Sequence, residues 1–302
     1  MVALPEKFKN EFSGIIKINE PLSLHTYYQT GGPVDFFLIP KIENDLRLIS
    51  EWICDQNIPF FSLGLGSNLL VSDAGYRGLV LKTSQFNQTL FENETTIQLG
   101  AGVPISKILR LAGQNNWSGF EILGGIPGSI GGACFMNAGT HLGETKSLLT
   151  ALEGYLLKPQ FKKINFHQSD LHYSYRTHHF LPDHFVITST WWKKVKGENV
   201  KSKILEVIER RKSTQPVDQP SCGSVFKNPY ESGLRSWQVI EKLGLRGYRV
   251  GGAQFSEKHA NFIVNLGNAK SQDIYDLIHL AKKRAQEELG IILKEEVRYL
   301  GF

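Results

Sequence analysis

The feature that most constrains this chain is the glycine-rich stretch GGIPGSIGGACFMNAG at residues 124–139, which places six glycines in sixteen residues. Glycine loses more conformational freedom on folding than any other residue, so this density is costly unless backbone must approach something closely. Flexible linkers are polar, whereas this stretch is mostly apolar. No lysine follows at the Walker spacing, so bound phosphate would be held by backbone N–H groups. Close packing of two backbones is the alternative.

A shorter glycine loop precedes it. The run Gly64-Leu65-Gly66-Ser67-Asn68 begins like a dinucleotide fingerprint, but leucine stands where the third glycine belongs. The residues that follow, 70–73, favour a strand over a helix, which disfavours a nicotinamide-binding Rossmann domain. A turn of exposed amides suited to an oxyanion is one interpretation. A simple hairpin turn is the other.

Length and hydrophobic periodicity predict a mixed α+β protein of more than one domain. The chain has 302 residues, which exceeds the usual size of a single core. The pattern predicts a β-α-β unit over 34–63, and the Pro-rich segment 213–223 is the best candidate for a domain crossing. We expect one domain at 1–198, with subdomains 1–82 and 83–198, and a second at 199–302. Further elements are expected as strands at 69–72, 78–82, 96–100, 249–255, 261–266 and 296–300, and as helices at 104–116, 200–212, 234–243 and 271–289.

Charge and cysteine content exclude several classes of function. The net charge of +5 is dispersed, with no Lys/Arg stripe and no interleaved aromatic residues, so nucleic acid is not an expected partner. Three cysteines form no CxxC pair, which indicates a reducing compartment. No signal peptide and no run of 18 apolar residues is present, so a cytoplasmic protein without membrane insertion is expected. Histidines at 167–184 have no ligand spacing, and no metal is expected.

Five motifs in a fixed order carry a resemblance that covers nearly the whole chain. They are Gly64–Asn68, Gly125–Gly132, Met136–Gly139, SCGSVF at 221–226 and EVR at 296–298. Together they resemble the UDP-N-acetylenolpyruvoylglucosamine reductases. The resemblance implies an α+β fold with an FAD-binding domain of the vanillyl-alcohol-oxidase (PCMH) type in two subdomains, followed by a C-terminal α+β substrate domain. It also implies non-covalent FAD, NADPH as reductant, and UDP-N-acetylglucosamine enolpyruvate as substrate in peptidoglycan precursor synthesis.

The implied reaction reduces an enolpyruvyl ether, which builds enolate-like charge beside a carboxylate and requires a proton at carbon. By resemblance Ser224 donates that proton. Arg176, in a Tyr-Arg pair, has a planar fork suited to the carboxylate, and Glu296 assists it. Without the resemblance, Ser224 would be interpreted as a turn serine, and Glu296 with Arg298 as a surface ion pair.

The binding residues follow from the same motifs. The implied cofactor-binding residues are Leu63, Gly64, Leu65, Gly66, Ser67, Asn68, Leu69, Gly125, Ile126, Pro127, Gly128, Ser129, Gly131, Gly132, Ala133, Asn137 and Gly139. The implied substrate-binding residues are Tyr175, Asn228, Arg246 and Arg298.

The chain departs from the family pattern in two places. Thr214 stands where a lysine is common, which leaves open whether Arg211 or Lys212 replaces it. No long insertion separates Arg176 from the helix expected at 200, so the chain resembles the shorter class that lacks the tyrosine loop closing over the substrate. Two other functions remain in view: an FAD-dependent oxidase of an alcohol or sugar on the same scaffold, and a nonenzymatic nucleotide-sugar-binding module.

Overall fold

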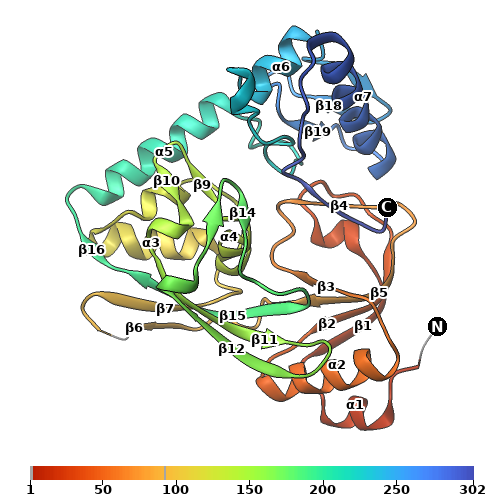
Figure 1. The fold of residues 1–302 in the computed structure, drawn as a ribbon, viewed down its shortest axis with the longest axis vertical. Helices are drawn as coiled ribbons and strands as arrows, with labels where there is room; N and C mark the ends of the chain where they lie inside the picture. The colour runs from red at the N-terminus through yellow and green to blue at the C-terminus, as the bar shows by residue number, and fades with distance from the viewer. Residues whose placement is uncertain (1–2, 92) are drawn as a thin grey trace. The chain divides into compact units, whose positions relative to one another are not determined.

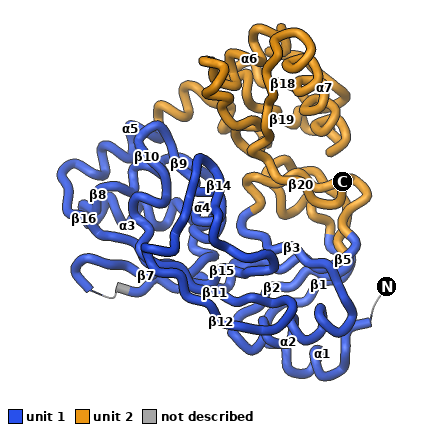
Figure 2. Tube along the Cα trace, in the orientation of Figure 1, with its two compact units in different colours: residues 1–20, 35–65, 77–208 blue, residues 21–34, 66–76, 209–302 orange. Residues whose placement is uncertain are grey.

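A computed structural model describes residues 3–91 and 93–302, and Figure 1 shows the course of the chain. Contacts between residues divide the chain into two compact units (Figure 2). Unit 1 comprises residues 1–20, 35–65 and 77–208, and unit 2 comprises residues 21–34, 66–76 and 209–302. Two short N-terminal segments therefore group with the C-terminal part, which a single cut at 198/199 does not anticipate. The assignment of 1–198 to the cofactor and 199–302 to the substrate stays a prediction about function.

The first sheet of unit 1 has the order β1-β2-β5-β3. Its strands are β1 (Ile15–Pro21), β2 (Pro33–Ile39), β3 (Phe60–Leu63) and β5 (Tyr76–Lys82). Helix α2 (Glu43–Asp55) lies along this sheet in Figure 1, and α1 (Glu6–Glu11) lies beside it. Leu46, Ile49 and Ile53 are fully buried at the helical spacing that the sequence predicts. The β-α-β unit is confirmed, with β5 inserted between its two strands.

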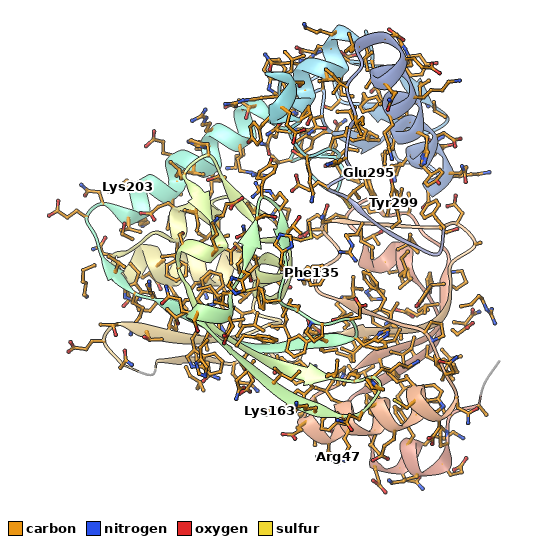
Figure 3. All side chains as sticks on the ribbon, in the orientation of Figure 1. Arg47, Phe135, Lys163, Lys203, Glu295 and Tyr299 are labelled. Carbon is orange, nitrogen blue, oxygen red and sulfur yellow. The ribbon has the colours of Figure 1, made fainter. Side chains whose placement is uncertain are left out.

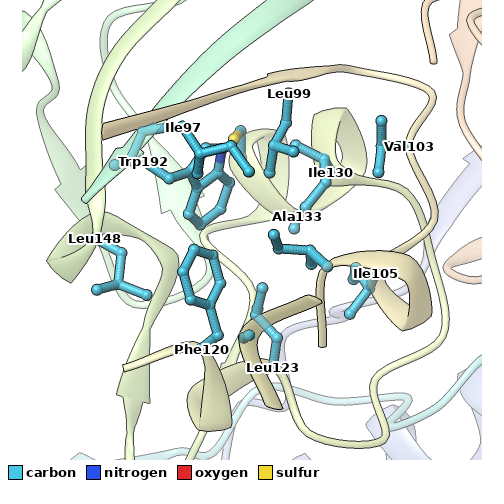
Figure 4. Close-up of a cluster of buried hydrophobic side chains, with 14 of the residues drawn as sticks. Ile97, Leu99, Val103, Ile105, Phe120, Leu123, Ile130, Ala133, Leu148 and Trp192 are labelled. Carbon is cyan, nitrogen blue, oxygen red and sulfur yellow. The ribbon is translucent and has the colours of Figure 1, made fainter. Parts of the chain in front are cut away.

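The second sheet of unit 1 is antiparallel and has the order β12-β11-β15-β7-β6. Its strands are β6 (Thr89–Phe91), β7 (Thr96–Gly100), β11 (Leu149–Leu156), β12 (Lys162–His167) and β15 (Phe185–Lys193). Helices α3 (Ile105–Asn115) and α4 (Ile130–Met136) belong to the same core. Figure 4 shows Trp192 and Phe120 beside Ile130 at its centre. The glycine-rich stretch therefore continues into a helix that is anchored in a closely packed core.

Unit 2 has a core of its own, formed mainly by buried residues of two helices and a small sheet. The helices are α6 (Ser236–Lys242) and α7 (Ser271–Leu289), and the antiparallel strands are β17 (Arg249–Val250), β18 (Ala253–Phe255) and β19 (Ile263–Asn265). Strand β4 (Leu69–Val71) pairs in parallel with β20 (Arg298–Leu300). Helix α5 (Val200–Thr214) contributes residues to both units. The remaining short strands are β8 (Trp117–Ser118), β9 (Gly139–Thr140), β10 (Gly143–Glu144), β13 (Tyr173–Ser174), β14 (Thr177–His178) and β16 (Val195–Lys196).

Most long elements lie where the periodicity predicts them, and three short ones do not. The strand expected at 249–255 is a hairpin, because Gly251 adopts φ +52° between β17 and β18. The strand expected at 296–300 begins at Arg298. Helix α4 was not predicted in the glycine-rich stretch; the Ser129 hydroxyl accepts a hydrogen bond from the Gly132 N–H at its first turn. Among the described helices, none combines the length and apolar character needed to cross a bilayer.

Candidate active site

The first glycine loop connects β3 to β4 and presents backbone donors. Gly66 adopts φ +70°, and a Cβ atom there would lie 1.9 Å from the His25 carbonyl oxygen. Within residues 3–91 and 93–302, the N–H groups of Gly64, Leu65, Gly66 and Asn68 have no hydrogen-bond acceptor. Successive amide donors of this kind bind anionic oxygens. The loop thus has the donor set that a pyrophosphate requires.

The second glycine loop leads into α4 and offers a comparable set. Gly125 and Gly128 adopt φ +69° and +144°, a conformation that side-chain-bearing residues rarely adopt. The N–H groups of Gly125, Gly128 and Ser129 find no acceptor in the described part of the chain. A Cβ atom on Gly64 would lie 2.5 Å from the Ser129 hydroxyl oxygen, so this loop and Gly64 are in close contact within unit 1. Gly64 and the second loop could therefore serve the same anionic group.

Other glycines of the same stretch have packing roles, the alternative considered from the sequence. A Cβ atom on Gly124 would lie 2.5 Å from Val207 Cγ1, and one on Gly131 would lie 2.8 Å from Ala101 Cβ. Gly139 is as tightly constrained, because its Cβ atom would lie 2.1 Å from the Gly143 carbonyl oxygen. The glycine density thus has two causes: left-handed backbone at Gly125 and Gly128, and close packing elsewhere.

Arg176 belongs to a tight turn between β13 and β14, where it adopts φ +54°. Its guanidinium donates to the carbonyl oxygens of Asn137 (3.2 Å) and Gly139 (2.6 Å), and it lies 5.1 Å from the Tyr175 ring centroid. A third partner is the Glu144 carboxylate at 3.4 Å. The structure thus joins the Tyr-Arg pair to the Met136–Gly139 motif within unit 1.

Asn137 is held in the same network. It is fully buried in a left-handed conformation at the end of α4, and its side-chain amide donates to Glu144 and to the Ser174 carbonyl oxygen. Its side-chain oxygen accepts from the Lys146 N–H. The side chain of Asn137 therefore orders the protein around Arg176, a role that the motif alone does not reveal.

Ser224 lies in a short extended segment of unit 2. Ser224 forms an isolated antiparallel β-bridge with Phe262, and Phe226, two residues later, forms one with Glu295. The Ser224 hydroxyl has no hydrogen-bond partner among the residues that the structure describes, and a Cβ atom added to Gly223 would meet nothing within 4 Å. Behind it, the Cys222 thiol is buried and faces the Leu69 carbonyl oxygen at 3.4 Å. Cys222 thus anchors this loop in the core, and the Ser224 hydroxyl keeps its proton available for donation.

Glu296 and Arg298 are held by two other motifs of unit 2. The Glu296 N–H donates to the Val225 carbonyl oxygen (2.8 Å), and the Asn68 side-chain amide donates to the Glu296 carbonyl oxygen (2.9 Å). The Arg298 N–H returns to the Asn68 backbone oxygen (3.1 Å). Three segments that are far apart in the sequence therefore meet beside Ser224.

Glu295, the neighbour of Glu296, has partners of its own. Its carboxylate pairs with Lys282 at 2.5 Å and accepts from the Tyr299 hydroxyl at 3.4 Å. Figure 3 labels Glu295 and Tyr299 on the C-terminal part of the chain. Burial and this carboxylate together raise the pKa of Tyr299 well above its ordinary value. Glu295 thus has a structural role within unit 2.

Two of the expected substrate-binding residues have partners within the protein. The Asn228 side-chain oxygen accepts from the Ser236 N–H at the start of α6 (3.1 Å). Arg246 pairs with the Glu241 carboxylate and donates to the Glu257 carbonyl oxygen. Either residue must share or exchange these bonds to contact a ligand.

The histidines near Arg176 have packing roles. His178 lies edge-on to the Phe135 ring, and His179 shares a hydrogen bond with the Ser174 hydroxyl. Within the described ranges, no cluster of three or more His, Cys, Asp or Glu side chains could hold a metal ion.

Comparison with known proteins identifies the family. One family model, described as an FAD binding domain, matches residues 34–156, and another, described as the C-terminal domain of UDP-N-acetylenolpyruvoylglucosamine reductase, matches residues 215–300. A UDP-N-acetylenolpyruvoylglucosamine reductase from Synechocystis sp. is 40% identical over 294 residues, which cover 95% of this chain and 91% of the relative. The chain belongs to the UDP-N-acetylenolpyruvoylglucosamine reductase family.

Other members of the family agree with this assignment. The reductase from Halalkalibacterium halodurans is 37% identical over 307 residues, which cover 100% of this chain and 99% of the relative. The crystal structure of the reductase from Thermus caldophilus has a TM-score of 0.78 and 31% identity, covering 95% of this chain and 98% of that one. The expected fold class, an α+β FAD-binding domain of the vanillyl-alcohol-oxidase type followed by a C-terminal α+β domain, is confirmed.

Sequence reasoning about this reductase family missed two contributions. Glu144 lies outside the five motifs, and no spacing in the sequence marks it as a partner of Arg176. Asn68 was expected to bind the cofactor, and its side chain also holds the Glu296 carbonyl oxygen, 228 residues away in the chain. Only the tertiary fold reveals these two contacts.

Proposed function

We propose that the chain catalyses the NADPH-dependent, FAD-mediated reduction of UDP-N-acetylglucosamine enolpyruvate to UDP-N-acetylmuramate, a step of peptidoglycan precursor synthesis. Full-length similarity to reductases of that name supports the proposal. The observation that carries it is local: Glu296 is hydrogen-bonded to both Val225 and Asn68. These bonds lie beside the Ser224 hydroxyl, which has no hydrogen-bond partner among the described residues. The comparisons favour this activity over an alcohol oxidase or a nonenzymatic sugar-nucleotide module.

The chain's own residues supply binding, charge stabilisation and a proton. Bound FAD would supply the hydride-transfer chemistry that connects NADPH with the terminal carbon of the enolpyruvyl group. The free N–H groups of Gly125, Gly128 and Ser129, together with those of the first loop, bind the cofactor's phosphates. Arg176 and Glu296 bind and polarise the substrate carboxylate, so that the negative charge developing beside it is stabilised. Ser224 donates a proton to the adjacent carbon.

The two domains expected from the sequence divide the binding of cofactor and substrate between them. Residues 1–198 form the cofactor-binding domain, and residues 199–302 form the substrate domain, which binds the nucleotide sugar through Asn228, Arg246 and Arg298. Tyr175 of the first domain also contacts the substrate. The protein acts in the cytoplasm, where NADPH and reduced cysteines are maintained.

Arg211, in place of the usual lysine, is the residue we assign to the substrate diphosphate. The Lys212 ammonium pairs with Glu209 at 2.7 Å on an exposed face of α5. Arg211 is less exposed than Lys212, and its Nε atom is buried. A guanidinium presents a fork that matches diphosphate oxygens.

Steady-state turnover tests the proposal. Purified protein is mixed with NADPH and UDP-N-acetylglucosamine enolpyruvate without oxygen, and NADPH absorbance is followed while mass spectrometry detects the product. We expect one NADPH to be consumed for each product, whose mass is greater than that of the substrate by two hydrogens. Consumption of an alcohol or sugar with oxygen, and no product from the enolpyruvyl substrate, would establish an oxidase instead.

A further inference from the structure

Glu144, at the end of β10, links two residues of the candidate site through its two carboxylate oxygens. One oxygen accepts from the Asn137 side-chain amide (2.8 Å), and the other lies 3.4 Å from the Arg176 Nη1 atom. That same Nη1 donates to the Asn137 carbonyl oxygen at 3.2 Å. Asn137, Glu144 and Arg176 therefore form a closed ring of contacts, all within unit 1.

The backbone conformations show why the ring matters. Arg176 and Asn137 both adopt positive φ, +54° and +46°. Asparagine tolerates this region, whereas a long side chain such as arginine rarely adopts it, and such residues persist where surrounding contacts determine them. The Glu144 carboxylate and the carbonyl oxygens of Asn137 and Gly139 provide these contacts for Arg176.

Burial distinguishes this ion pair from those on the protein surface. The side chains of Arg176 and Glu144 are 14% and 19% exposed, whereas Lys146, which lies 3.8 Å from the other Glu144 oxygen, is 50% exposed. Exposed pairs hold a side chain weakly, because water screens the charges and both partners keep their rotamer freedom. A pair with little exposure has a more fixed geometry, so the Glu144 carboxylate is suited to fixing a guanidinium in one orientation.

We propose that Glu144 is a positioning residue: it holds the Arg176 guanidinium in the orientation that binds the substrate carboxylate, and it acts on the reaction only through Arg176. The inference rests on the proposed function, because it presumes that Arg176 contacts the substrate. A charge-stabilising group is effective when its geometry is fixed before the reaction. Loss of the carboxylate should leave the charge of Arg176 in place while its fork becomes mobile.

Glu144→Gln is the informative change, because it removes the charge and retains the side-chain length and an oxygen acceptor for Asn137. Anaerobic stopped-flow absorbance then gives the rates of flavin reduction by NADPH and of flavin reoxidation by the enolpyruvyl substrate. We expect an unchanged flavin content, an unchanged reduction rate, and reoxidation slowed about 10-fold. Calorimetric binding of UDP-N-acetylmuramate to the oxidised protein, which needs no turnover, should weaken at least several-fold.

The matched control is Glu153→Gln. Glu153 also lies in unit 1, is 20% exposed and pairs with Lys163 at 3.0 Å on β11 and β12, remote in sequence from the Tyr-Arg pair. We expect both half-reactions of this variant to match those of the wild type. In an Arg176→Lys background, Glu144→Gln should have little further effect on reoxidation, because a residue that acts only through Arg176 has nothing left to orient.

Three results would overturn the inference: a wild-type reoxidation rate in Glu144→Gln, equal slowing of both half-reactions, or full additivity with Arg176→Lys. If Glu144→Gln does not fold with bound flavin, Glu144→Asp keeps the charge and withdraws the carboxylate by one methylene, and the same comparisons apply. Failure of the proposed function is distinguishable, because the wild-type flavin itself would then not be reoxidised by the enolpyruvyl substrate.

Discussion

At the scale of single residues, Asn68 differs from its neighbours in the first glycine loop, because its side chain holds the protein while its backbone N–H remains available to a ligand. Asn68→Asp keeps the backbone and the shape of the side chain but removes the amide that donates to the Glu296 carbonyl oxygen. Loss of one such hydrogen bond costs about 0.5–1.5 kcal/mol. We therefore expect reoxidation by the substrate to slow roughly 2- to 10-fold, with flavin content little changed.

Asn268→Asp provides the control, because it adds the same charge at an exposed position of unit 2. Both half-reactions of this variant should match the wild type when followed by stopped-flow absorbance. A large loss of FAD from Asn68→Asp, with reoxidation otherwise normal, would instead show that the side chain serves the cofactor.

The three cysteines should differ sharply in reactivity. Burial raises the pKa of the Cys222 thiol to about 12 and that of Cys134 well above its ordinary value, whereas Cys54 is partly exposed. The thiolate is the reactive form, so a disulfide reagent at pH 8 should modify one thiol per native chain and three after denaturation. Cys54→Ser should leave no rapidly reacting thiol. Fast modification of Cys222 in the native protein would contradict this account.

The raised pKa of Cys222 also predicts how the free energy of unfolding changes with pH. An unfolded cysteine ionises near ~8.5, whereas folded Cys222 keeps its proton up to about 12. The stability that this shift contributes is therefore fully present below about pH 8.5 and is lost as the pH rises toward 12, because only the unfolded state ionises to the thiolate in this window. Urea denaturation at several alkaline pH values should show a smaller pH dependence for Cys222→Ala than for the wild type.

Residue identities in the motifs could be predicted, but their partners could not. The spacing around Ser224 and Glu296 is local information, and the family resemblance assigned their roles. The contact between Asn68 and Glu296 joins positions 228 residues apart and depends on the parallel pairing of β4 with β20. No periodicity in one sequence encodes such a pairing.

At the scale of elements, the second glycine loop provides the clearest test of cofactor binding. Gly128 adopts φ +144°, and its carbonyl oxygen accepts from the Ile105 N–H at the start of α3 (3.0 Å). Gly128→Val puts a branched side chain in a disfavoured conformation, at a cost of about 1–2 kcal/mol, and beside an N–H group assigned to FAD. We expect flavin content to fall several-fold, measured as the ratio of visible to ultraviolet absorbance.

The control is Gly267→Val, which also puts a branched side chain at a positive φ but lies in unit 2. Gly267 adopts φ +107° in unit 2, and a Cβ atom there would meet nothing within 4 Å. This variant should lose some stability and retain its flavin. Retention of wild-type flavin by Gly128→Val would remove the loop from the cofactor site.

Helices and strands with strong periodicity could be predicted from the sequence, and elements set by the tertiary structure could not. The spacing of Leu46, Ile49 and Ile53 fixed the buried face of α2. Helix α4, by contrast, contains Gly131 and Gly132, which disfavour helix, and it is stabilised by the Ser129 cap and by burial of Ile130 and Cys134. Tertiary packing overrode propensity there.

At the scale of the whole molecule, the chain has two compact units that do not follow one cut in the sequence. Residues 21–34 and 66–76 group with the C-terminal part because β4 pairs with β20 and because the Asn265 side chain donates to the Tyr28 carbonyl oxygen (2.8 Å). The units divide inside α5, at 208/209, and the domain crossing at the Pro-rich segment 213–223 stays a prediction. Composition marks loops, whereas long-range pairing decides which segments pack together.

The most direct test of the central claim separates the two half-reactions in Ser224→Ala, using anaerobic stopped-flow absorbance of the flavin. Reduction by NADPH requires no proton at a substrate carbon, so its rate should be near normal. Reoxidation by UDP-N-acetylglucosamine enolpyruvate requires that proton, and loss of a positioned general acid typically slows such a step ~10²- to 10⁴-fold. The account predicts a flavin that is bleached by NADPH and stays reduced when the substrate is added. Equal slowing of both half-reactions, or of neither, would contradict it.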